Sequence, residues 1–226
     1  MRDKNRKAWL YSVDKELAKQ LKKEDFSDIL ENIDIEVHLS MCMNPIEPQD
    51  KFYRYFINAI YRHYKDPEMF EEPELIRIAS AEAIILDPFE NEDEVLMDMC
   101  DADSGDLLAA YVALFDDDEC LREPLEDYSP APVCYLEEFI VTEQLEFLQA
   151  EILRWIIKYL SSFSSILVFL PMPSYRSYDE VNQISCLTRD FDDKKIKKFR
   201  KFFTSQGFFP LRDTDYMYHI YDYSMD

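Results

Sequence analysis

The sequence predicts one domain of the α/β class, with an N-terminal helical extension in front of it. The chain has 226 residues, of which 47% are hydrophobic, so it can bury a substantial core. Segments with helical spacing and segments with alternating spacing of apolar residues follow one another along the chain. We therefore assign residues 1–32 to the helical extension and residues 33–226 to the α/β domain.

The first part of the chain reads as helices around one short strand. Apolar residues at helical spacing predict a helix or helix pair over 8–31, and IDIEVHLSM (33–41) alternates as a strand. KFYRYFINAIYRHYK (51–65) is amphipathic and aromatic, which favours a helix. PELIRIASAEAIIL (73–86) predicts a further helix that begins at Pro73.

The middle of the chain predicts a hairpin, a strand and a long helix. Two apolar runs within 93–118 are separated by DADSGD, and Gly105 supplies the turn between them. VCYLEEFIV (133–141) is typical of a strand. Residues 142–163 have strong helical spacing, with Thr142 as the N-cap.

The last part of the chain predicts a buried strand, a loop, a helix and a terminal strand. SILVFLPMP (165–173) is a continuous apolar run, typical of a central strand, and the next twenty residues read as a loop. Residues 192–209 predict a helix with acidic residues at its start, closed by Gly207. Alternation over 213–223 indicates a strand.

The net charge of −22 is concentrated in one stretch of the chain. Residues 66–127 hold 22 acidic and two basic residues, a local charge of −20. Such a field repels nucleic acid and anionic membranes and attracts cations, so we expect a cationic small molecule or a basic protein surface as partner. A well-solvated surface and an acidic mimic of DNA remain the alternatives. The Lys-rich helix at 192–209 is expected to pair with this acidic segment rather than to bind nucleic acid.

Cysteine, histidine and glycine usage excludes several classes of site. The five cysteines include no C-x-x-C pair, which favours reduced thiols in a cytoplasmic protein. No apolar run reaches the about 18 residues of a membrane span, and the N-terminus has no signal-peptide pattern. His38, His63 and His219 are far apart, so we expect no metal site. Gly105 and Gly207 are the only glycines, which excludes a Gly-rich phosphate loop.

Three segments carry a family resemblance. LLAAYVALFD (107–116) is similar to a third strand, YLEEFIV (135–141) to a fourth strand, and FRKFFTSQGFFPL (199–211), followed by YMYHIYD, to the ending of the GNAT acetyltransferase superfamily. Together with the order of the elements, the resemblance covers about residues 33–223. It implies a GNAT-like fold, in which helices flank a mixed, mostly antiparallel central sheet. It also implies acetyl-CoA as cofactor if the chain is an N-acetyltransferase.

The chain departs from that family where acetyl-CoA binds. The resemblance places a pyrophosphate-binding loop with two small residues after the fourth strand, at a helix N-terminus. Aligned on Val141, its cationic or amide position is Glu146, its first glycine is Gln149 and its last small residue is Glu151. The carboxylates of Glu143, Glu146 and Glu151 would lie where the pyrophosphate binds and would repel it. We therefore expect no cofactor in the usual place.

The catalytic positions also differ. The resemblance places a proton-donating tyrosine at Phe203, which has no proton to give. Tyr216 is our candidate for a replacement acid, and Glu137 or Glu138 our candidate for a base, with strand alternation placing the two glutamates on opposite faces of the sheet. Other tyrosines could substitute for Tyr216, namely Tyr175, Tyr178 and Tyr218.

Three functions from different classes remain open. We favour a GNAT-derived binding or regulatory protein that lacks standard acetyl-CoA binding. The first alternative is an active N-acetyltransferase with a non-standard CoA site that acts on a cationic amine. The second alternative is an acidic decoy of a nucleic-acid-binding protein, which only the charge favours.

Overall fold

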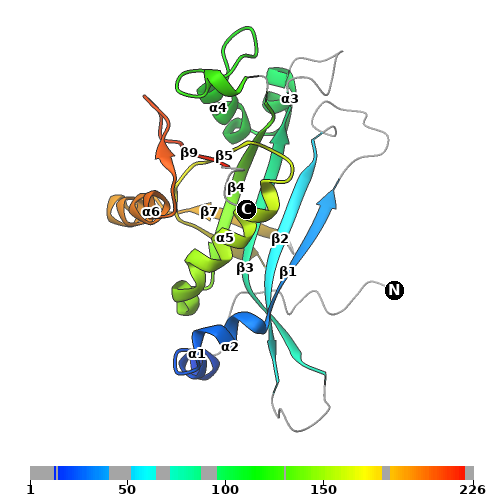
Figure 1. The fold of residues 1–226 in the computed structure, drawn as a ribbon, viewed down its shortest axis with the longest axis vertical. Helices are drawn as coiled ribbons and strands as arrows, with labels where there is room; N and C mark the ends of the chain where they lie inside the picture. The colour runs from blue at the N-terminus through cyan, green and yellow to red at the C-terminus, as the bar shows by residue number, and fades with distance from the viewer. Residues whose placement is uncertain are drawn as a thin grey trace.

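The computed structural model describes residues 13, 15–40, 52–64, 72–87, 96–129, 131–179 and 184–221, and the side chains of 175–187 lie outside the description. Its centre is a seven-stranded sheet of order β1-β2-β3-β4-β5-β9-β8, antiparallel except for the β4–β5 pair (Figure 1). The strands are β1 (Ile33–Ser40), β2 (Arg54–His63), β3 (Glu74–Leu86), β4 (Val133–Val141), β5 (Ile166–Phe169), β8 (Phe209–Pro210) and β9 (Met217–Ile220). The predicted mixed, mostly antiparallel sheet is confirmed.

Helices cover both faces of this sheet. The helices of the described residues are α1 (Lys15–Leu21), α2 (Phe26–Glu31), α3 (Leu96–Asp103), α4 (Gly105–Leu114), α5 (Gln149–Leu160) and α6 (Asp193–Ser205). Residues of α1, α2, α5 and α6 share one hydrophobic cluster with one face of the sheet, and α3 and α4 share a second cluster with the other face. Leu17 and Ile29 of the expected extension lie in the first of these clusters.

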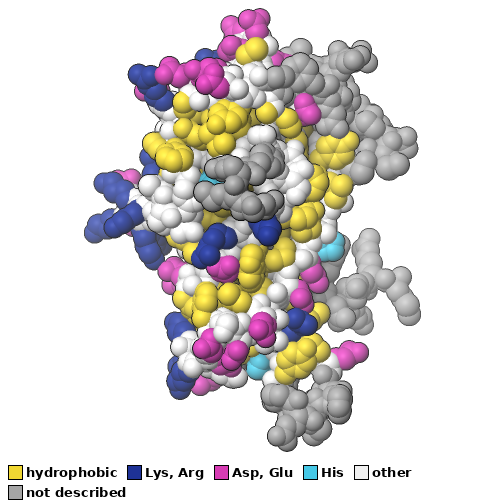
Figure 2. Space-filling view, viewed as in Figure 1, with side chains coloured by type: hydrophobic (Ala, Val, Ile, Leu, Met, Phe, Trp, Pro, Cys, Tyr) yellow, Lys and Arg dark blue, Asp and Glu magenta, His cyan; other side chains and the backbone are white. Residues whose placement is uncertain are grey.

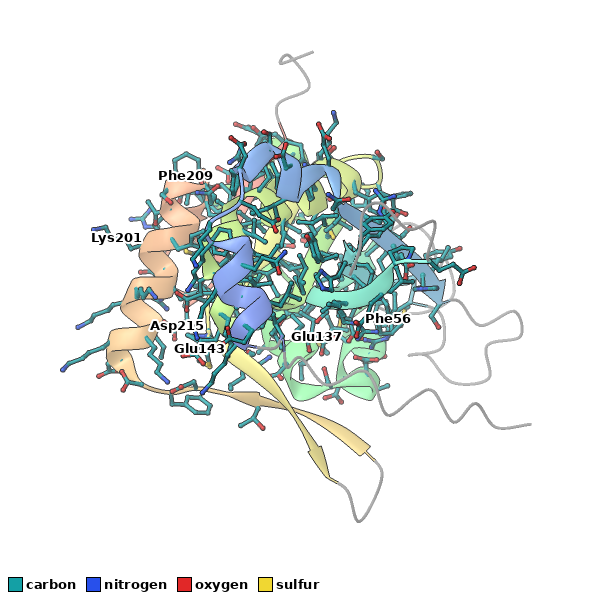
Figure 3. The ribbon with its side chains drawn as sticks, turned by 90° about the horizontal axis from the view of Figure 1, so that it is seen from below. Phe56, Glu137, Glu143, Lys201, Phe209 and Asp215 are labelled. Atoms are coloured by element: carbon teal, nitrogen blue, oxygen red, sulfur yellow. The ribbon has the colours of Figure 1, made fainter. Side chains whose placement is uncertain are left out.

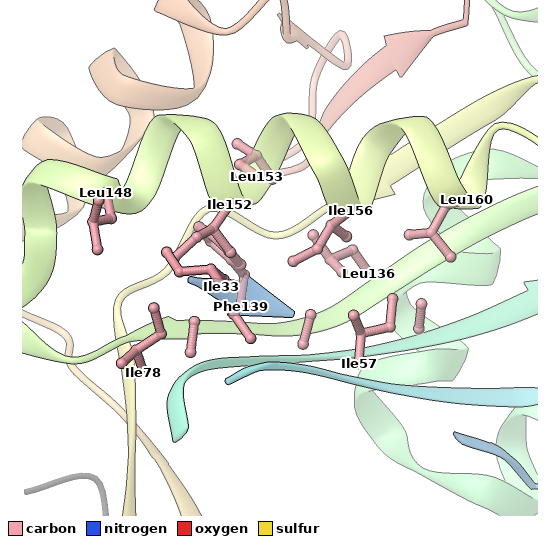
Figure 4. Close-up of a cluster of buried hydrophobic side chains, with 14 of the residues drawn as sticks. Ile33, Ile57, Ile78, Leu136, Phe139, Leu148, Ile152, Leu153, Ile156 and Leu160 are labelled. Atoms are coloured by element: carbon pink, nitrogen blue, oxygen red, sulfur yellow. The ribbon is translucent and has the colours of Figure 1, made fainter. Parts of the chain in front are cut away.

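Helix α5 supplies the centre of the first cluster. Ile152 and Ile156 of α5 point down toward Phe139 and Leu136 of β4, and Leu148, just before α5, lies above Ile78 of β3 (Figure 4). All are buried, and the i, i+4, i+8 spacing of the helical residues is what places them on one face. Each such side chain contributes roughly 1.5–3 kcal/mol through burial. This packing fixes the end of β4 against the rest of the molecule.

The parallel pair separates partway along β4. Val133 to Leu136 pair with Ile166 to Phe169, where β5 ends, while β4 continues for five more residues to Val141. A second, two-stranded sheet follows β5 in the chain, formed by β6 (Ser174–Asp179) and β7 (Ile184–Arg189). This hairpin lies on the same side of the main sheet as α3 and α4 (Figures 1 and 3).

Two predicted helices are wrong, because the described residues of 51–65 contain strand β2 and residues 73–86 contain strand β3. Residues 51–65 are rich in tyrosine, phenylalanine and isoleucine, and residues 73–86 contain four isoleucines; these residue types pack well on a pleated surface. Both strands are covered on their two faces, so their apolar residues do not alternate cleanly with polar ones and mimic a buried helix. Pairing of β2 with β1 and of β3 with β4 then stabilises both segments as strands rather than helices.

The predicted hairpin at 93–118 is also wrong, since its described residues form helices α3 and α4. The segment LLAAYVALFD, which resembles a third strand, is helical. Ser104 separates α3 from α4 and is the N-cap of α4. Its Oγ accepts a hydrogen bond from the Leu107 amide at 3.2 Å. Gly105 is therefore the first residue of a helix rather than a turn residue with positive φ.

Other predicted elements are confirmed or refined. The strands at 33–41, 133–141, 165–173 and 213–223 correspond to β1, β4, β5 and β9, and Gly207 has a φ of +85° after α6. The predicted long helix begins as the 3₁₀ segment η4 (Glu143–Leu148), and Thr142 makes no side-chain capping bond. The predicted loop after β5 contains β6 and β7 instead.

Candidate functional site

A β-bulge in β4 places two glutamates on one face of the sheet. In the β3–β4 ladder Glu82 pairs with Glu138 and Ala83 pairs with Leu136, so Glu137 is the extra residue. Glu137 bonds to Arg54, and Glu138 accepts a hydrogen bond from Ser80 Oγ at 2.9 Å. The partners of both glutamates belong to the face that α3 and α4 cover. The expectation that alternation separates Glu137 from Glu138 is therefore wrong.

Three carboxylates converge on one guanidinium at this place. Nη1 of Arg54 lies 3.3 Å from Glu82 Oε1 and 3.3 Å from Glu137 Oε2, and Nη2 bonds to Oδ1 of Asp103. We refer to these four residues as the Arg54 cluster. They come from β2, β3, β4 and the last turn of α3. Every side chain of the cluster is at least three-quarters buried, and Figure 3 shows Glu137 beneath the sheet near α3 and α4.

Burial and crowding change the proton affinity of the cluster. Desolvation is the largest influence on Glu137 and raises the pKa of its carboxyl, and the nearby charge of Glu82 raises it further. Arg54 opposes this increase but does not cancel it. A carboxyl with a raised pKa can exchange a proton closer to neutral pH than an exposed glutamate can.

The polar character of this face continues beyond the cluster. Glu138 is 2% exposed, and Asn58 of β2, which pairs with Ser80 in the ladder, is also buried. Nearer to the β4–β5 pair, the same face becomes apolar, where Ile84 and Val133 pack against α3 and α4. The boundary between the polar and the apolar part of this face cannot be seen in the sequence, because Asn58, Ser80 and Glu138 lie on three different strands.

Tyr216, our candidate acid, belongs to a neighbouring group. Its ring lies 6.3 Å from the ring of Tyr135, and its hydroxyl lies 3.5 Å from the carbonyl oxygen of Asp106. Arg189 bonds to the Asp106 carboxylate at 2.6 Å. Burial, followed by the charge of Asp106, raises the pKa of Tyr216 to about 12, so its hydroxyl stays protonated at neutral pH.

Tyr135 stands between Tyr216 and Glu137. It lies on β4 two residues before Glu137, and both Glu137 and Tyr216 act on it electrostatically. Its hydroxyl is buried and has no hydrogen-bond partner among the described residues. The structure thus brings Glu137, Glu138 and Tyr216 to the same face of the sheet, while the described contacts include no direct bond between Tyr216 and either glutamate.

The segment after β4 is occupied by its own hydrogen bonds. Val141 is the last residue of β4, and the 3₁₀ segment η4 follows directly. The Leu145 amide donates to the carbonyl oxygen of Thr142 at 2.8 Å, and the Gln149 amide donates to that of Glu146. These amides are therefore already satisfied within the turn rather than directed at a bound anion.

The carboxylates of this segment are paired with nearby cations. Glu146 bonds to Nζ of Lys198 in α6 at 3.0 Å, and Glu151 bonds to Arg154 one helical turn later at 2.7 Å. Glu143 is in the first turn of η4 (Figure 3). Glu146 and Glu151, which the resemblance placed in a pyrophosphate-binding loop, thus lie at a helix start and pair with a cation of α6 and a cation of α5, respectively.

Metal and thiol chemistry find little support in the described part of the chain. No group of His, Cys, Asp and Glu there could hold a metal ion, and none of its helices has the length and apolarity needed to cross a membrane. Burial raises the pKa of Cys100 to about 12, and it also raises the pKa of Cys134, which disfavours the reactive thiolate. Cys120 is a free, exposed thiol.

Sequence reasoning missed Arg54, Glu82 and Asp103. Each fell in a segment assigned to the wrong element, so no spacing rule could bring them together. One partial signal was present, because the polar residues Arg54 and Asn58 have the same parity along β2 and would share one face of a strand. Comparison with known proteins found no match, whether among family models, curated proteins or solved structures.

Proposed function

We propose that this chain is a GNAT-derived binding or regulatory protein that binds a cationic group at the Arg54 cluster and does not bind acetyl-CoA in the manner usual for that family. The convergence of Glu82, Asp103 and Glu137 on one guanidinium is the observation that carries the proposal. Carboxylates held together in a poorly solvated place favour a nearby positive charge.

The geometry after β4 supports the part of the proposal that concerns acetyl-CoA. A pyrophosphate needs free amides at a helix start and tolerates few carboxylates there. The amides of Leu145 and Gln149 are engaged in the turn, and Glu146 is bonded to Lys198. Binding of a pyrophosphate would require these bonds to break, and it would place anions beside Glu143 and Glu151.

The ligand of this proposal is a primary amine or a guanidinium. The group could belong to a small polyamine or to a lysine or arginine of a basic protein surface. Arg54 already shows that a guanidinium fits among these carboxylates, with two of its nitrogens bonded to three acids. Glu138, next to Glu137, adds a fourth carboxylate on the same face of the sheet.

An acetyltransferase that acts on a cationic amine is the second candidate. The observation that favours it is the separation of β4 from β5 after Leu136, which leaves the last five residues of β4 without a β5 neighbour. In this candidate function, Glu137 with its raised pKa would accept a proton from the amine, and Tyr216 would return one to the leaving thiolate. The raised pKa of Glu137 favours proton uptake, whereas Tyr216 carries its proton at neutral pH but is a weaker acid than an ordinary tyrosine.

The proposal is tested by titrating the protein with spermidine in a calorimeter. We expect binding that weakens by about tenfold or more in the double variant E82Q/E137Q, because two of the carboxylates are lost. The control is E126Q/D127N, which removes two exposed carboxylates and should change the affinity by about twofold at most. Equal weakening in both variants would attribute binding to the general acidic surface and would contradict the proposal.

A further inference from the structure

Helix α6 concentrates positive charge in an acidic protein. Six of the 25 Lys and Arg residues of the chain lie in these 13 residues: Lys194, Lys195, Lys197, Lys198, Arg200 and Lys201. In Figure 2, the Lys and Arg side chains gather along the edge of the molecule where Figure 1 shows α6. This surface is separate from the Arg54 cluster, since α6 packs against the opposite face of the sheet.

Half of these cations are held by neighbouring carboxylates. Lys195 bonds to Asp190, Lys198 bonds to Glu146, and Arg200 bonds to Asp215. None of these carboxylates belongs to the acidic segment 66–127, with which we expected the helix to pair. The apolar side of α6 is fixed by Phe203, which is fully buried against Phe139 and Phe169.

The other three cations form a stripe that faces solvent. Lys194, Lys197 and Lys201 are exposed and make no ion pair with any residue that the structure describes. At about 100° per residue they lie within about 60° of one another, on the side of α6 opposite Phe203. Figure 3 shows Lys201 directed away from the body of the protein. We refer to these three residues as the lysine stripe.

We propose that the lysine stripe is a docking surface for a short acidic segment of a partner protein. Seven residues of helix separate its ends, a distance of about 10 Å. Three carboxylates can match this length from one face of a helix at i, i+4 and i+7, or from alternate residues of an extended peptide over about 13 Å. Charge complementarity of this kind sets partner choice and the rate of association.

The surroundings of the stripe favour an acidic peptide over a nucleic acid. Glu146 and Asp215 border α6 on its two sides, and Asp192 and Asp193 stand at its start. A polynucleotide carries phosphates beyond both ends of a 10 Å stripe and would meet these carboxylates. The net charge of −22 would repel it further. A segment with only a few acidic residues fits between these carboxylates and carries less charge, so it meets less of both repulsions.

Fluorescence anisotropy with labelled hexaglutamate, at about 0.1 M salt, tests this inference. The stripe variant is K194Q/K197Q/K201Q. The matched control is K15Q/K22Q/K23Q, which removes three exposed lysines of the α1 region and changes the net charge equally. We expect the stripe variant to weaken hexaglutamate binding by about tenfold or more and the control by about twofold at most. Circular dichroism verifies that both variants fold.

A labelled six-residue oligothymidine and a sedimentation run complete the test. Oligothymidine should bind more weakly than hexaglutamate. Equal or tighter binding of the oligonucleotide would overturn the inference in favour of a nucleic-acid surface, and equal weakening by the two triple variants would show that no specific surface exists. Self-association that disappears only in the stripe variant would make a second copy of this chain the occupant and would also overturn it.

Discussion

Glu137 and Glu138 are neighbours in β4, yet both side chains lie on the same face of the sheet. The bulge opposite Glu82 is responsible, because it adds one residue to β4 and cancels the alternation at that point. Glu137 can therefore reach Arg54 while Glu138 reaches Ser80. This local irregularity gathers carboxylates at one place on the face that α3 and α4 partly cover.

Replacement of Arg54 by methionine should destabilise the protein strongly at neutral pH. The change leaves Glu82, Asp103 and Glu137 without their shared guanidinium, and loss of one partner from a largely buried charge pair costs about 3 kcal/mol. The free energy of unfolding, measured by urea titration at pH 7.5 and pH 5.5, checks this prediction.

The loss in free energy of unfolding caused by R54M should become smaller at pH 5.5, because the carboxylates left without a guanidinium can then take up protons. The conservative variant R54K is the control and should lose less stability, since it keeps the charge but not the forked geometry. A cost of R54M that is independent of pH would indicate lost packing rather than lost charge.

Replacement of Glu137 by glutamine should change how stability depends on pH. The folded-state pKa of Glu137 is raised, so folded protein binds this proton more tightly than unfolded protein does. In the wild type, the free energy of unfolding therefore decreases as the pH rises from the ordinary pKa of a glutamate through the raised pKa of Glu137. The stability of E137Q minus that of the wild type should increase between pH 5 and pH 8. Urea titrations across this range test the sign, and a decreasing difference would contradict the raised pKa.

Replacement of Tyr135 by phenylalanine should leave stability unchanged or raise it by up to about 1 kcal/mol. The hydroxyl of Tyr135 is fully buried without a partner among the described residues, and a buried group of this kind costs about 1–3 kcal/mol when it is unsatisfied. Thermal unfolding of Y135F and the wild type gives the comparison. A loss of more than about 1 kcal/mol would mean that the hydroxyl has a bonding partner in solution.

The two glycines should respond oppositely to alanine. A Cβ at Gly105 meets nothing within 4 Å, and the residue begins a helix, so G105A should stabilise by about 0.5 kcal/mol. Gly207 has a φ of +85°, and a Cβ there lies 3.4 Å from the ring of His219, so G207A should cost about 1–2 kcal/mol. Urea denaturation of both variants measures the difference. Equal effects would contradict the assignment of Gly105 to the start of α4.

Part of the fold could be predicted because local signals and tertiary packing agree. The strand at 133–141 has its predicted ends, and the helix at 193–205 has an N-cap in Asp192 and a left-handed residue in Gly207. The errors lie where local signals are ambiguous. No residue of 54–63 or 76–86 is exposed, so neither face of these strands is polar and their pattern does not distinguish a helix from a strand.

The candidate site was predicted less completely than the fold. Glu137, Glu138 and Tyr216 do lie on one face, but the grouping of Arg54 with Glu82 and Asp103 depends on strand register and on a bulge. Neither can be inferred from the spacing of residues in one strand. Asp103 additionally depends on the packing of α3 against the sheet, which the predicted hairpin had excluded.

Calorimetric titration with acetyl-CoA is the most direct test of the central proposal, that this chain does not bind acetyl-CoA at the segment after β4. The satisfied amides of Leu145 and Gln149, together with the Glu146–Lys198 ion pair, predict no binding heat at millimolar ligand. Micromolar binding, equivalent to about −8 kcal/mol, would contradict the claim and support the acetyltransferase candidate.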